Sequence, residues 1–518
     1  MPRFNFDGWK EEVSTGKKEL FPSNLTGGIL LQRKELVNKL CDMLLDPGEF
    51  GGVSWNHYFR SPAGNGKSVL LMLLGREFEK RNCDVFYFEV AGLLDDYPKE
   101  SYIEARRESL RQNKKLVIMV DEVQQSPDAN LWTPLLKSMG NMLVIGMGIP
   151  KFDSSSPQFL RKHSPSELYF NSNSEDMEEL IDVFMEEMKG RDVSRETVSE
   201  ICRYVCDYTG GHMFPMLKFC EHIFHPNQSS HLEKYHYAIY FSSQKFYDSY
   251  DYDNVRGRCF AELPLGPISE VLRCGRKVNT DMVSLDKCGY WNYKKGWFIS
   301  KCLVDVIYNT LPYDSKCHKE SISIRDLNVS EKIERIINIG LHHMEPSDFE
   351  EPTSDMSKYE DAIGFGWAWQ VKCCFPSLYI ATQVQQPTGV KIKKGGKHPC
   401  IDFVFNGEND IGIELVRNGR NKECAEHVAR FDGKYKRWGE SGAVLNFITD
   451  DTKVKDLFES PKVPVYHFFK GENALYKGNT LLKQGVVRSL PTPPPKRGFC
   501  TMRNLGSKIL TNSLKYIR

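Results

Sequence analysis

Short apolar runs alternate with amphipathic stretches over the first third of the chain. The runs at 52–59, 83–90, 114–125 and 141–150 are short and β-rich, and each predicts a buried strand. Residues 67–81 follow the first run, carry an apolar face at helical spacing and predict a helix. Strands that alternate with helices indicate an α/β unit built on a parallel sheet.

The middle of the chain has a different pattern. Residues 201–220 predict a helix, a break at Gly210 and Gly211, and a second helix. Residues 255–312 alternate short helical runs with a small pair of strands, which suits a winged-helix module. His212, directly after the glycines, is expected either to face a ligand or to cap the second helix.

Two β-rich runs near the C-terminal end, 401–405 and 411–416, flank a turn over 406–410 and predict a hairpin. If the five turn residues form the loop, opposed residues have numbers that sum to 816. Large apolar side chains then share one face of the hairpin, in the pairs Phe405 with Ile411, Phe403 with Ile413 and Ile401 with Leu415.

The same register places two acids opposite each other on the other face of this hairpin. Asp402 and Glu414 would be cross-strand neighbours with Cβ atoms about 5 Å apart, where like charges repel. A divalent cation between the carboxylates removes this repulsion, so we interpret the pair as a metal site. The alternative is a solvated hairpin with no bound ion.

These patterns divide the chain into five parts. We expect an α/β multidomain protein, because 518 residues exceed one ordinary hydrophobic core. The predicted parts are an N-terminal segment (1–45), an α/β unit with a helical lid (46–230), a winged-helix-like domain (231–330), a second α/β domain (331–485) and a basic tail (486–518).

Composition changes this picture little. Apolar residues make up 40% of the chain and charged residues 26%, as in ordinary globular proteins, and the formal net charge is +1. Neither a polyanion-binding protein nor an enzyme for acidic substrates is indicated for the whole chain. The exception is the stretch from Asn473 to Arg518, which holds nine Lys or Arg residues and no Asp or Glu.

Two features of the sequence indicate where in the cell the protein works. They are the spacing of its cysteines and its lack of long apolar runs. The fifteen cysteines show no CxxC pair with zinc-finger spacing, and Cys202 and Cys206 are placed to pack on a helix. No run approaches a membrane span, and the first residues lack the apolar region of a signal peptide. We therefore expect reduced thiols and a soluble protein that works inside a cell.

The loop between the first strand and the first helix carries the chemistry of a phosphate site. Backbone amides can point inward where Gly64 and Gly66 leave no Cβ in the way. Lys67 is placed for the β- and γ-phosphates of ATP and the Ser68 hydroxyl for Mg²⁺. Ser61 stands where the phosphate-loop consensus has its first Gly, but it only begins the turn.

A second acidic motif completes the predicted nucleotide site. Asp121 and Glu122 end the strand over 114–125. Asp121 is expected to hold the Mg²⁺ shell and Glu122 to orient or deprotonate the attacking water. The order of elements is that of a P-loop ATPase with an additional central strand. The run at 141–150 lacks a polar sensor at its end, and Arg161 is either an arginine finger or a solvated side chain.

The metal-binding pair at 402 and 414 has further candidate partners. An acid on each of two adjacent strands is the metal-binding half of the PD-(D/E)xK nuclease fold, but Val416 stands where that family has a Lys. His427, Arg430 and Lys434 lie at spacings of three and four on the helix predicted over 422–438. One of them is a candidate replacement for the Lys.

Together these motifs resemble one family. "RSPAGNGKS", "VIMVDE", "TGGH", "KCGYW", "GIELVRNG" and "HVARFDGKYK" occur in this order. The chain resembles the Crinkler effectors of oomycetes and fungi and the related retrotransposon hot-spot proteins of trypanosomes, which join a P-loop NTPase to a restriction-endonuclease-like domain. The resemblance covers residues 30 to about 450, and the last two motifs are its most specific part.

The resemblance implies an ATP- and Mg²⁺-dependent effector that acts in the nucleus, contacts DNA and perturbs host gene expression or causes cell death. Host nuclear factors and a homo-oligomer are further partners it suggests, and no membrane is expected. The N-terminal translocation header of many Crinklers is missing, and Glu360 lies early for the glutamate of the first nuclease helix. A nucleotide-switched binding protein with an inert nuclease fold, and a purely signalling ATPase, remain alternatives.

Overall fold

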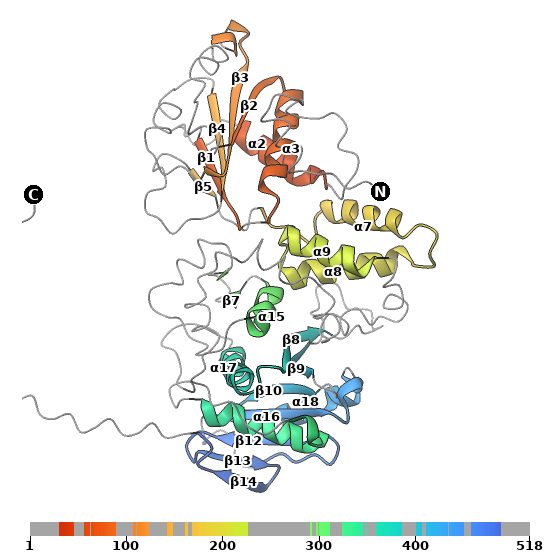
Figure 1. Ribbon diagram of the computed structural model, residues 1–518, viewed down its shortest axis with the longest axis vertical. Coiled ribbons are helices and arrows are strands. Elements are labelled where there is room, and N and C mark those ends of the chain that lie inside the picture. Colours follow the sequence, from red (N-terminus) through yellow and green to blue (C-terminus); the bar gives the residue numbers. More distant parts are fainter. Residues whose placement is uncertain are drawn as a thin grey trace, which may run out of the picture.

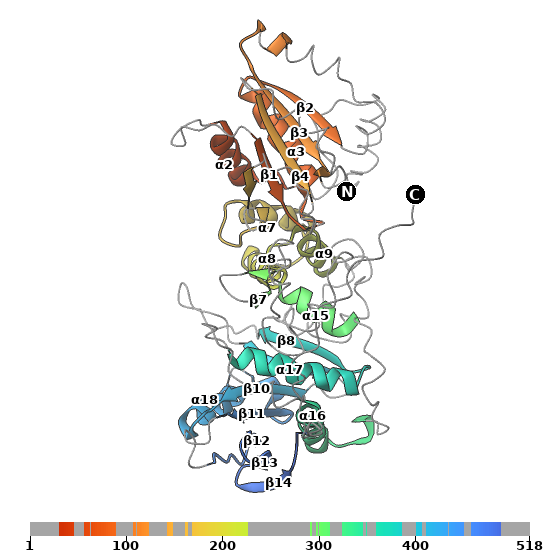
Figure 2. The same cartoon turned by 90° about the vertical axis from the view of Figure 1, so that its left-hand side faces the viewer.

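The computed structural model describes part of the chain. The described residues are 31–45, 56–62, 64–89, 107–109, 111–123, 142–148, 161–163, 168–225, 291–292, 297–298, 300–310, 324–344, 349, 359–385, 400–406, 411–433, 435–449 and 457–487. They form an elongated arrangement with one sheet at each end and helices between the sheets (Figures 1 and 2).

The first sheet is parallel throughout and has the strand order β2-β3-β4-β1-β5. Its strands are β1 (Asn56–Arg60), β2 (Cys83–Glu89), β3 (Lys115–Asp121), β4 (Met142–Gly148) and β5 (Arg161–His163). β4 pairs with β1 on one side and with β3 on the other, which confirms the additional central strand. Six of the seven residues of β3 and all seven of β4 are buried, as expected for strands covered on both faces.

Two helices pack together against this sheet. α3 (Lys67–Lys80) follows β1, and α2 (Lys34–Leu45) packs on α3. Val37, Leu40 and Leu44 of α2 belong to the same buried apolar cluster as Leu71 and Phe78 of α3. Part of the segment that the sequence assigns to residues 1–45 therefore contributes to the core of the first sheet.

A three-helix unit lies beside the first sheet (Figure 1). It contains α7 (Asp176–Glu187), α8 (Arg195–Thr209) and α9 (Met213–Ile223). Gly210 and Gly211 separate α8 from α9, both with positive φ, which confirms the predicted break between two helices. Cys202 and Cys206 are buried in the helical core, as their spacing predicts.

Little of the predicted winged-helix region is described, because residues 226–290 and 311–323 lie outside the described part. The described elements are the two-stranded antiparallel sheet of β6 (Trp291–Asn292) and β7 (Trp297–Phe298), and the helix α15 (Lys301–Thr310). The small strand pair agrees with the sequence pattern, and the winged-helix assignment stays a prediction.

The second sheet is mixed and has seven strands in the order β14-β13-β12-β11-β10-β9-β8. β8 to β10 form an antiparallel meander, β10, β11 and β12 run parallel, and β13 and β14 return antiparallel. The strands are β8 (Tyr379–Gln385), β9 (Cys400–Asn406), β10 (Ile411–Arg417), β11 (Gly442–Ile448), β12 (Val465–Phe469), β13 (Ala474–Lys477) and β14 (Thr480–Gln484).

Helices cover both faces of the second sheet. α16 (Val329–His343), which follows the short 3-10 helix η4 (Ile324–Asp326), and α17 (Tyr359–Cys374) share a buried cluster with Phe403, Ile413 and Leu415. α18 (Asn421–Asp432) and the 3-10 helix η6 (Lys436–Trp438) share a different cluster, which contains Val404 and Val416. The helix predicted over 422–438 is thus divided, and α18 ends before Gly433.

The predicted hairpin register is confirmed at its first pairs and interrupted further on. Phe405 pairs with Ile411 and Phe403 with Ile413, as predicted. The prediction that Ile401 shares the face of Phe403 is wrong, because Ile401 lies in the cluster on the α18 side. The described β9–β10 ladder stops at Phe403, and the next side chain along β9, Asp402, binds the β10 backbone itself.

The described helices and the second sheet contribute to one hydrophobic core, and the domain boundaries expected at residues 230 and 331 stay predictions. One continuous buried cluster contains apolar residues of α7, α8, α9, α15, α16, α17 and the second sheet. Val486 and Val487, assigned by sequence to the basic tail, are buried in the same cluster. The central helices and the second sheet therefore share one core.

Candidate functional site

The loop between β1 and α3, described at residues 61–62 and 64–66, has the backbone of a phosphate cradle. Gly64 and Gly66 adopt φ values of 76° and 73°, in the left-handed region that favours glycine. A Cβ on Gly66 would meet nothing within 4 Å, so glycine is required there by backbone conformation rather than by space. Gly66 is the N-cap of α3, and no side chain caps this helix start. The helix N-terminus is thus open to an anion.

Lys67 and Ser68 begin α3 directly after the cradle. The Lys67 ammonium is buried and donates hydrogen bonds to the carbonyl oxygens of Ser61 at 3.1 Å and Pro62 at 2.9 Å. The loop therefore surrounds the Lys67 ammonium. This geometry suits an ammonium that binds phosphate oxygens in place of the two carbonyl oxygens. Ser68 is the second residue of the helix and is half-buried.

Asp121 and Glu122 end β3, one strand removed from β1. Asp121 is fully buried, its Oδ2 accepts a 3.1 Å bond from the Tyr87 hydroxyl, and its Oδ1 accepts from the amide of Glu122 at 3.0 Å. Glu122 has φ 54°, an unusual value for a residue with a side chain. Such backbone strain is common at functional sites.

The side chain of Tyr58 relates Glu122 to β1. Burial raises the pKa of Tyr58 to about 12; the nearby Arg60 guanidinium opposes this rise and the Glu122 carboxylate adds to it. Tyr58 pairs with Gly146 of the intervening strand β4, where a Cβ would lie 2.9 Å from the side chain of Val123. The missing side chain at 146 thus leaves room over β4 for the side chains of Tyr58 and Val123.

Asn65 fastens the loop to the helical unit and was not singled out from the sequence. Its Nδ2 donates to Ser61 Oγ at 2.6 Å and to the carbonyl of Leu168 at 3.3 Å, and its Oδ1 accepts from the amide of Met213 at 3.2 Å. The amide of Phe214 donates to the carbonyl of Gly64 at 2.9 Å. The first turn of α9 therefore rests directly on the predicted phosphate loop.

The structure excludes one of the two roles expected for His212. His212 is buried at the N-cap position of α9, but its side chain makes no capping hydrogen bond, so it is not a capping histidine. Its ring lies edge-on to Tyr169, with centroids 6.3 Å apart. Contact with a ligand stays a prediction for this residue.

Arg33, before α2, was also missed. It donates to the carbonyls of Leu168 and Tyr169 at 3.1 and 3.3 Å, and Leu168 is the residue that Asn65 binds. Burial lowers the pKa of Arg33 to about 10, against the stabilising charge of Asp176.

Arg161, weighed as an arginine finger, lies in β5 and pairs with His57, four residues before the loop begins. Its side chain is outside the described part.

The two acids of the second sheet differ in surroundings. Asp402 is half-buried, and its Oδ2 accepts a hydrogen bond from the amide of Leu415 at 2.7 Å, next to Glu414. Glu414 is completely buried, with its Oε2 2.9 Å from both Nδ1 of His427 and Nη1 of Arg430. Its Oε1 is buried and has no hydrogen-bond partner.

Tyr435, missed by the sequence reasoning, lies near both acids. Burial and the charge of Glu414 raise the pKa of its hydroxyl well above the ordinary value, and the charge of Asp402 adds to this. The Tyr435 hydroxyl donates to the carbonyl of Cys400, and its interaction with the Glu414 carboxylate adds to the rise in its pKa. An orphaned carboxylate oxygen beside a second carboxylate fits a cation.

The turn at 416–419 sets the position of α18 and so of His427 and Arg430. Asn418 has φ 49°, and its Oδ1 accepts from the amide of Thr449 at 2.8 Å. Asn446 accepts from the amide of Gly419 at 3.1 Å and donates to its carbonyl at 2.9 Å. The "VRNG" motif is therefore a locked turn, which directs the helix back over Glu414.

The other two positions expected at this site are Val416 and Lys434. Val416, in place of the family's Lys, is buried in the cluster under α18. Lys434 lies outside the described residues. Within the described ranges, no three His, Cys, Asp or Glu side chains are grouped as metal ligands. Asp402 and Glu414 therefore supply two ligands at most from the described acids.

Comparisons with known proteins give only distant similarities. No protein-family model matches the chain, and no curated protein matches it. The Holliday junction branch migration motor RuvB of Thermotoga maritima is 16% identical, with a TM-score of 0.22 over 39% of this chain and 65% of RuvB, less than two thirds of that chain. AMPPCP-bound DnaA from Aquifex aeolicus is 12% identical, with a TM-score of 0.24 over 47% of this chain and 73% of DnaA.

PCH-2 of C. elegans is 10% identical, with a TM-score of 0.24 over 39% of this chain and 70% of its own. At such scores none of these likenesses carries an argument about what this chain does. What the chain could bind is therefore argued from the parallel sheet and from the geometry of the loop between β1 and α3. Among the described helices, none combines the length and the apolar character needed to span a bilayer.

Proposed function

We propose that the chain is a P-loop ATPase. The observation that carries this proposal is the arrangement of the loop over 61–66, with two left-handed glycines, an uncapped helix start and Lys67 enclosed by loop carbonyls. The acids Asp121 and Glu122 end a strand of the same sheet, separated from β1 by one strand.

The proposed roles follow the chemistry of each side chain. Lys67 contacts the β- and γ-phosphates, and the amides of Gly64 and Gly66 line the cradle with Ser61 at its start. Ser68 and Asp121 would hold Mg²⁺, which supplies positive charge to the phosphates when bound. Glu122 orients the attacking water and accepts its proton.

The test is ATP binding and turnover by the full chain. Lys67→Ala is expected to weaken both by about a hundredfold or more, because it removes a preorganised charge from the phosphates. Glu122→Gln is expected to bind ATP but to lose turnover by about a hundredfold or more. Lys80→Ala, at the exposed end of the same helix, is the control. Wild-type protein that binds no ATP would refute the proposal.

We further propose that the second sheet is a PD-(D/E)xK nuclease-like domain that acts on DNA with Mg²⁺. Asp402 and Glu414 would hold the metal, and the buried, unpartnered Oε1 of Glu414 is the observation that favours it. The order of α17, three antiparallel strands, α18 and a parallel fourth strand also suits a nuclease core.

Roles for the basic residues follow from this proposal. His427 and Arg430 contact Glu414 and so are the groups available to replace the missing Lys, with Lys434 as a third candidate. The alternative is an inert fold that only grips DNA or a nuclear partner. It is favoured by Val416 and by the ion pair that already occupies Oε2 of Glu414.

A plasmid-nicking assay in Mg²⁺ distinguishes the nuclease from the inert DNA-binding fold. Cleavage lost in Asp402→Asn and Glu414→Gln, and kept in the exposed α18 control Glu426→Gln, is expected of the nuclease. Salt-sensitive DNA binding without any nicking, with or without ATP, would leave the binding module instead.

The resemblance to Crinkler effectors extends the proposal to the nucleus, to host nuclear factors and to altered host gene expression or cell death. A homo-oligomer is part of the same proposal, because an ATPase without an arginine finger of its own can take one from a neighbour. A fluorescent fusion excluded from nuclei would contradict the nuclear location, and a monomer by light scattering with ATP would contradict the oligomer.

A further inference from the structure

A fully buried carboxylate lies between the helical unit and the second sheet. Asp305 of α15 accepts three hydrogen bonds from two other elements. Its Oδ2 accepts from the Tyr208 hydroxyl of α8 at 2.8 Å, and its Oδ1 accepts from the hydroxyl and the amide of Thr382 of β8 at 2.8 and 3.0 Å.

On one side, this network begins beside the phosphate loop. Tyr208 lies in the last turn of α8, directly before the glycine turn that leads into α9. The first amides of α9 bind Asn65 and Gly64 of the loop. The carbonyl of Tyr208 also lies 3.5 Å from the hydroxyl of Ser300, at the start of α15. A continuous series of contacts therefore runs from the loop through the start of α9 to the end of α8 and on to α15.

On the other side, the network ends beside the two acids. Thr382 pairs with Phe403 of β9, and Phe403 is the neighbour of Asp402. Asn309 of α15 reinforces this junction: its Nδ2 donates to the carbonyl of Ile380 at 3.0 Å, and its Oδ1 accepts from the amide of Ile380 at 3.2 Å. α15 is thus joined to the backbone of the edge strand β8 at two alternate residues, Ile380 and Thr382.

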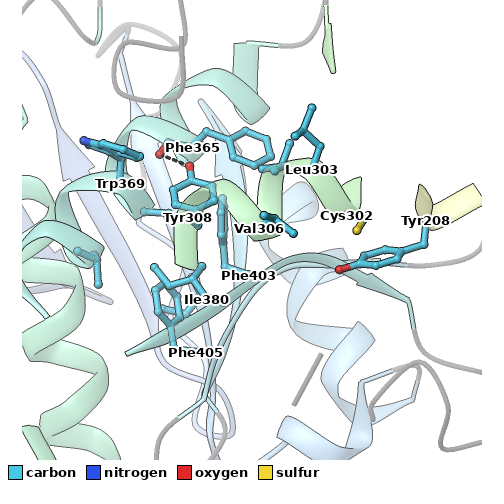
Figure 3. Close-up of a cluster of buried hydrophobic side chains, with 14 of the residues drawn as sticks. Tyr208, Cys302, Leu303, Val306, Tyr308, Phe365, Trp369, Ile380, Phe403 and Phe405 are labelled. Carbon is cyan, nitrogen blue, oxygen red and sulfur yellow. Dashed lines mark hydrogen bonds between the residues drawn. The ribbon is translucent and has the colours of Figure 1, made fainter. Parts of the chain in front are cut away.

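The surrounding side chains leave little room for independent movement. Figure 3 shows Tyr208 reaching toward a packed group that includes Cys302 and Val306 of α15 and Phe403 of β9. Tyr308 donates to the carbonyl of Phe365 at 2.7 Å, which joins α15 to α17 (Figure 3). Close-packed interiors of this kind transmit displacement.

Stability alone gives a poor reason for this carboxylate. Well-packed apolar residues of similar volume commonly stabilise a core as much as a buried polar network, or more. Burial, more than any neighbouring charge, raises the pKa of Asp305 to about 7, against the hydrogen bonds of Thr382 and Tyr208 and the charge of Lys301. A group held at such a cost is suited to specifying one arrangement of the elements that it joins.

We propose that Asp305 is a positioning residue, which couples the filling of the phosphate loop to the placement of the Asp402 strand through Tyr208 and Thr382. The inference rests on the proposed nucleotide function. It requires no DNA cleavage, because the coupled quantity is the position of β8 and β9.

Hydrogen exchange of the full chain tests this coupling. Exchange over 379–385 and 400–406 is measured with and without Mg²⁺ and AMPPCP, and nucleotide binding is titrated separately. In the wild type, we expect nucleotide to change exchange in these strands by about fivefold or more, the lower end of common allosteric couplings.

Tyr208→Phe is expected to bind nucleotide and to lose the response in β8 and β9. Thr382→Val, which removes only the hydroxyl, should weaken it. Tyr308→Phe is the matched control, because it deletes a buried tyrosine hydroxyl of the same cluster that does not bind Asp305. It should keep the response.

Two results would overturn the coupling: a nucleotide-bound wild type with unchanged exchange in β8 and β9, or a Tyr208→Phe variant that responds like the wild type. If the titration shows no nucleotide binding by the wild type, the ATPase proposal fails together with the coupling. The titration therefore distinguishes the two failures.

Discussion

The guanidinium of Arg430 and the carboxylate of Glu414 form an ion pair between α18 and β10, with Nη1 and Oε2 2.9 Å apart. The side chain of Glu414 is 1% exposed and that of Arg430 is 36% exposed. A carboxylate so far from water needs its partners, because an unpaired buried charge is costly.

Removing the arginine should therefore destabilise the second sheet. We expect Arg430→Met to lower the free energy of unfolding by about 2 kcal/mol, less than a fully buried pair loses, because Arg430 is partly solvated. Urea denaturation of the full chain measures the change. Arg195→Met, which breaks pairs between exposed side chains, should leave the unfolding midpoint unchanged. Equal effects of the two variants would contradict the prediction.

Two glycines of the helical unit offer a matched comparison. Gly211 has φ 75°, and a Cβ there would lie 2.1 Å from the carbonyl oxygen of Phe170. Gly190 has φ 85° and open space. Both alanine variants lose about 1 kcal/mol to left-handed strain. Gly211→Ala must also displace the Phe170 backbone, so its melting temperature should be lower by several degrees more and its nucleotide affinity should fall. Melting temperatures that fall equally would rule out the close approach at Gly211.

Asn65 is expected to contribute to both stability and nucleotide binding. Asn65→Ala leaves Ser61, Leu168 and Met213 without their buried partner, which costs about 1–3 kcal/mol. The loop should lose its preorganised shape, and affinity for an ATP analogue should fall. Asn479→Ala, which removes an exposed bond to Glu459, is the control. Unchanged affinity in Asn65→Ala would show that the loop keeps its shape without the Asn65 side chain.

The buried Asp305 predicts a pH dependence of stability. Its pKa is raised from 3.8 to about 7 in the folded protein, so the folded state binds a proton that the unfolded state has released between these values. Stability should therefore fall as pH rises from about 4 to 7, by roughly 4 kcal/mol at most for this group. The hydrogen bonds from Thr382 and Tyr208 and the charge of Lys301 act on this group and oppose the rise.

Asp305→Asn tests this dependence, because the amide resembles the protonated acid and cannot ionise. The melting temperature of the variant should change less between pH 5 and pH 8 than that of the wild type. At pH 8 the variant should be the more stable of the two. An identical pH profile in both proteins would exclude Asp305 as the titrating group.

The sequence predicted much of the first sheet, because its signals are local. Gly64, Gly66 and Lys67 are read from one loop, and the short runs at 83–90, 114–125 and 141–150 are apolar and β-rich. The contacts of Asn65 with Leu168 and Met213 could not be predicted, since they join residues more than a hundred positions apart. The same holds for Arg33 and Leu168.

The hairpin shows where period-two reasoning ends. Large apolar side chains fix the register at Phe403 and Phe405, and the structure follows it there. Beyond Phe403, the carboxylate of Asp402 takes the Leu415 amide and the alternation fails, which turns Ile401 to the other face. A polar side chain that competes for backbone hydrogen bonds leaves no trace in a hydrophobic pattern.

The continuous core from α7 to the second sheet makes this sheet dependent on helices that precede it in the chain. A fragment beginning at residue 331 would lack α15 and the helices before it. Phe365, Ile380 and Phe403 would then lose the apolar side chains that cover them. Such a fragment should aggregate, since a large apolar surface is left in water. Recombination or gene fusion could therefore transfer the second sheet to another protein only together with the helices that complete its core.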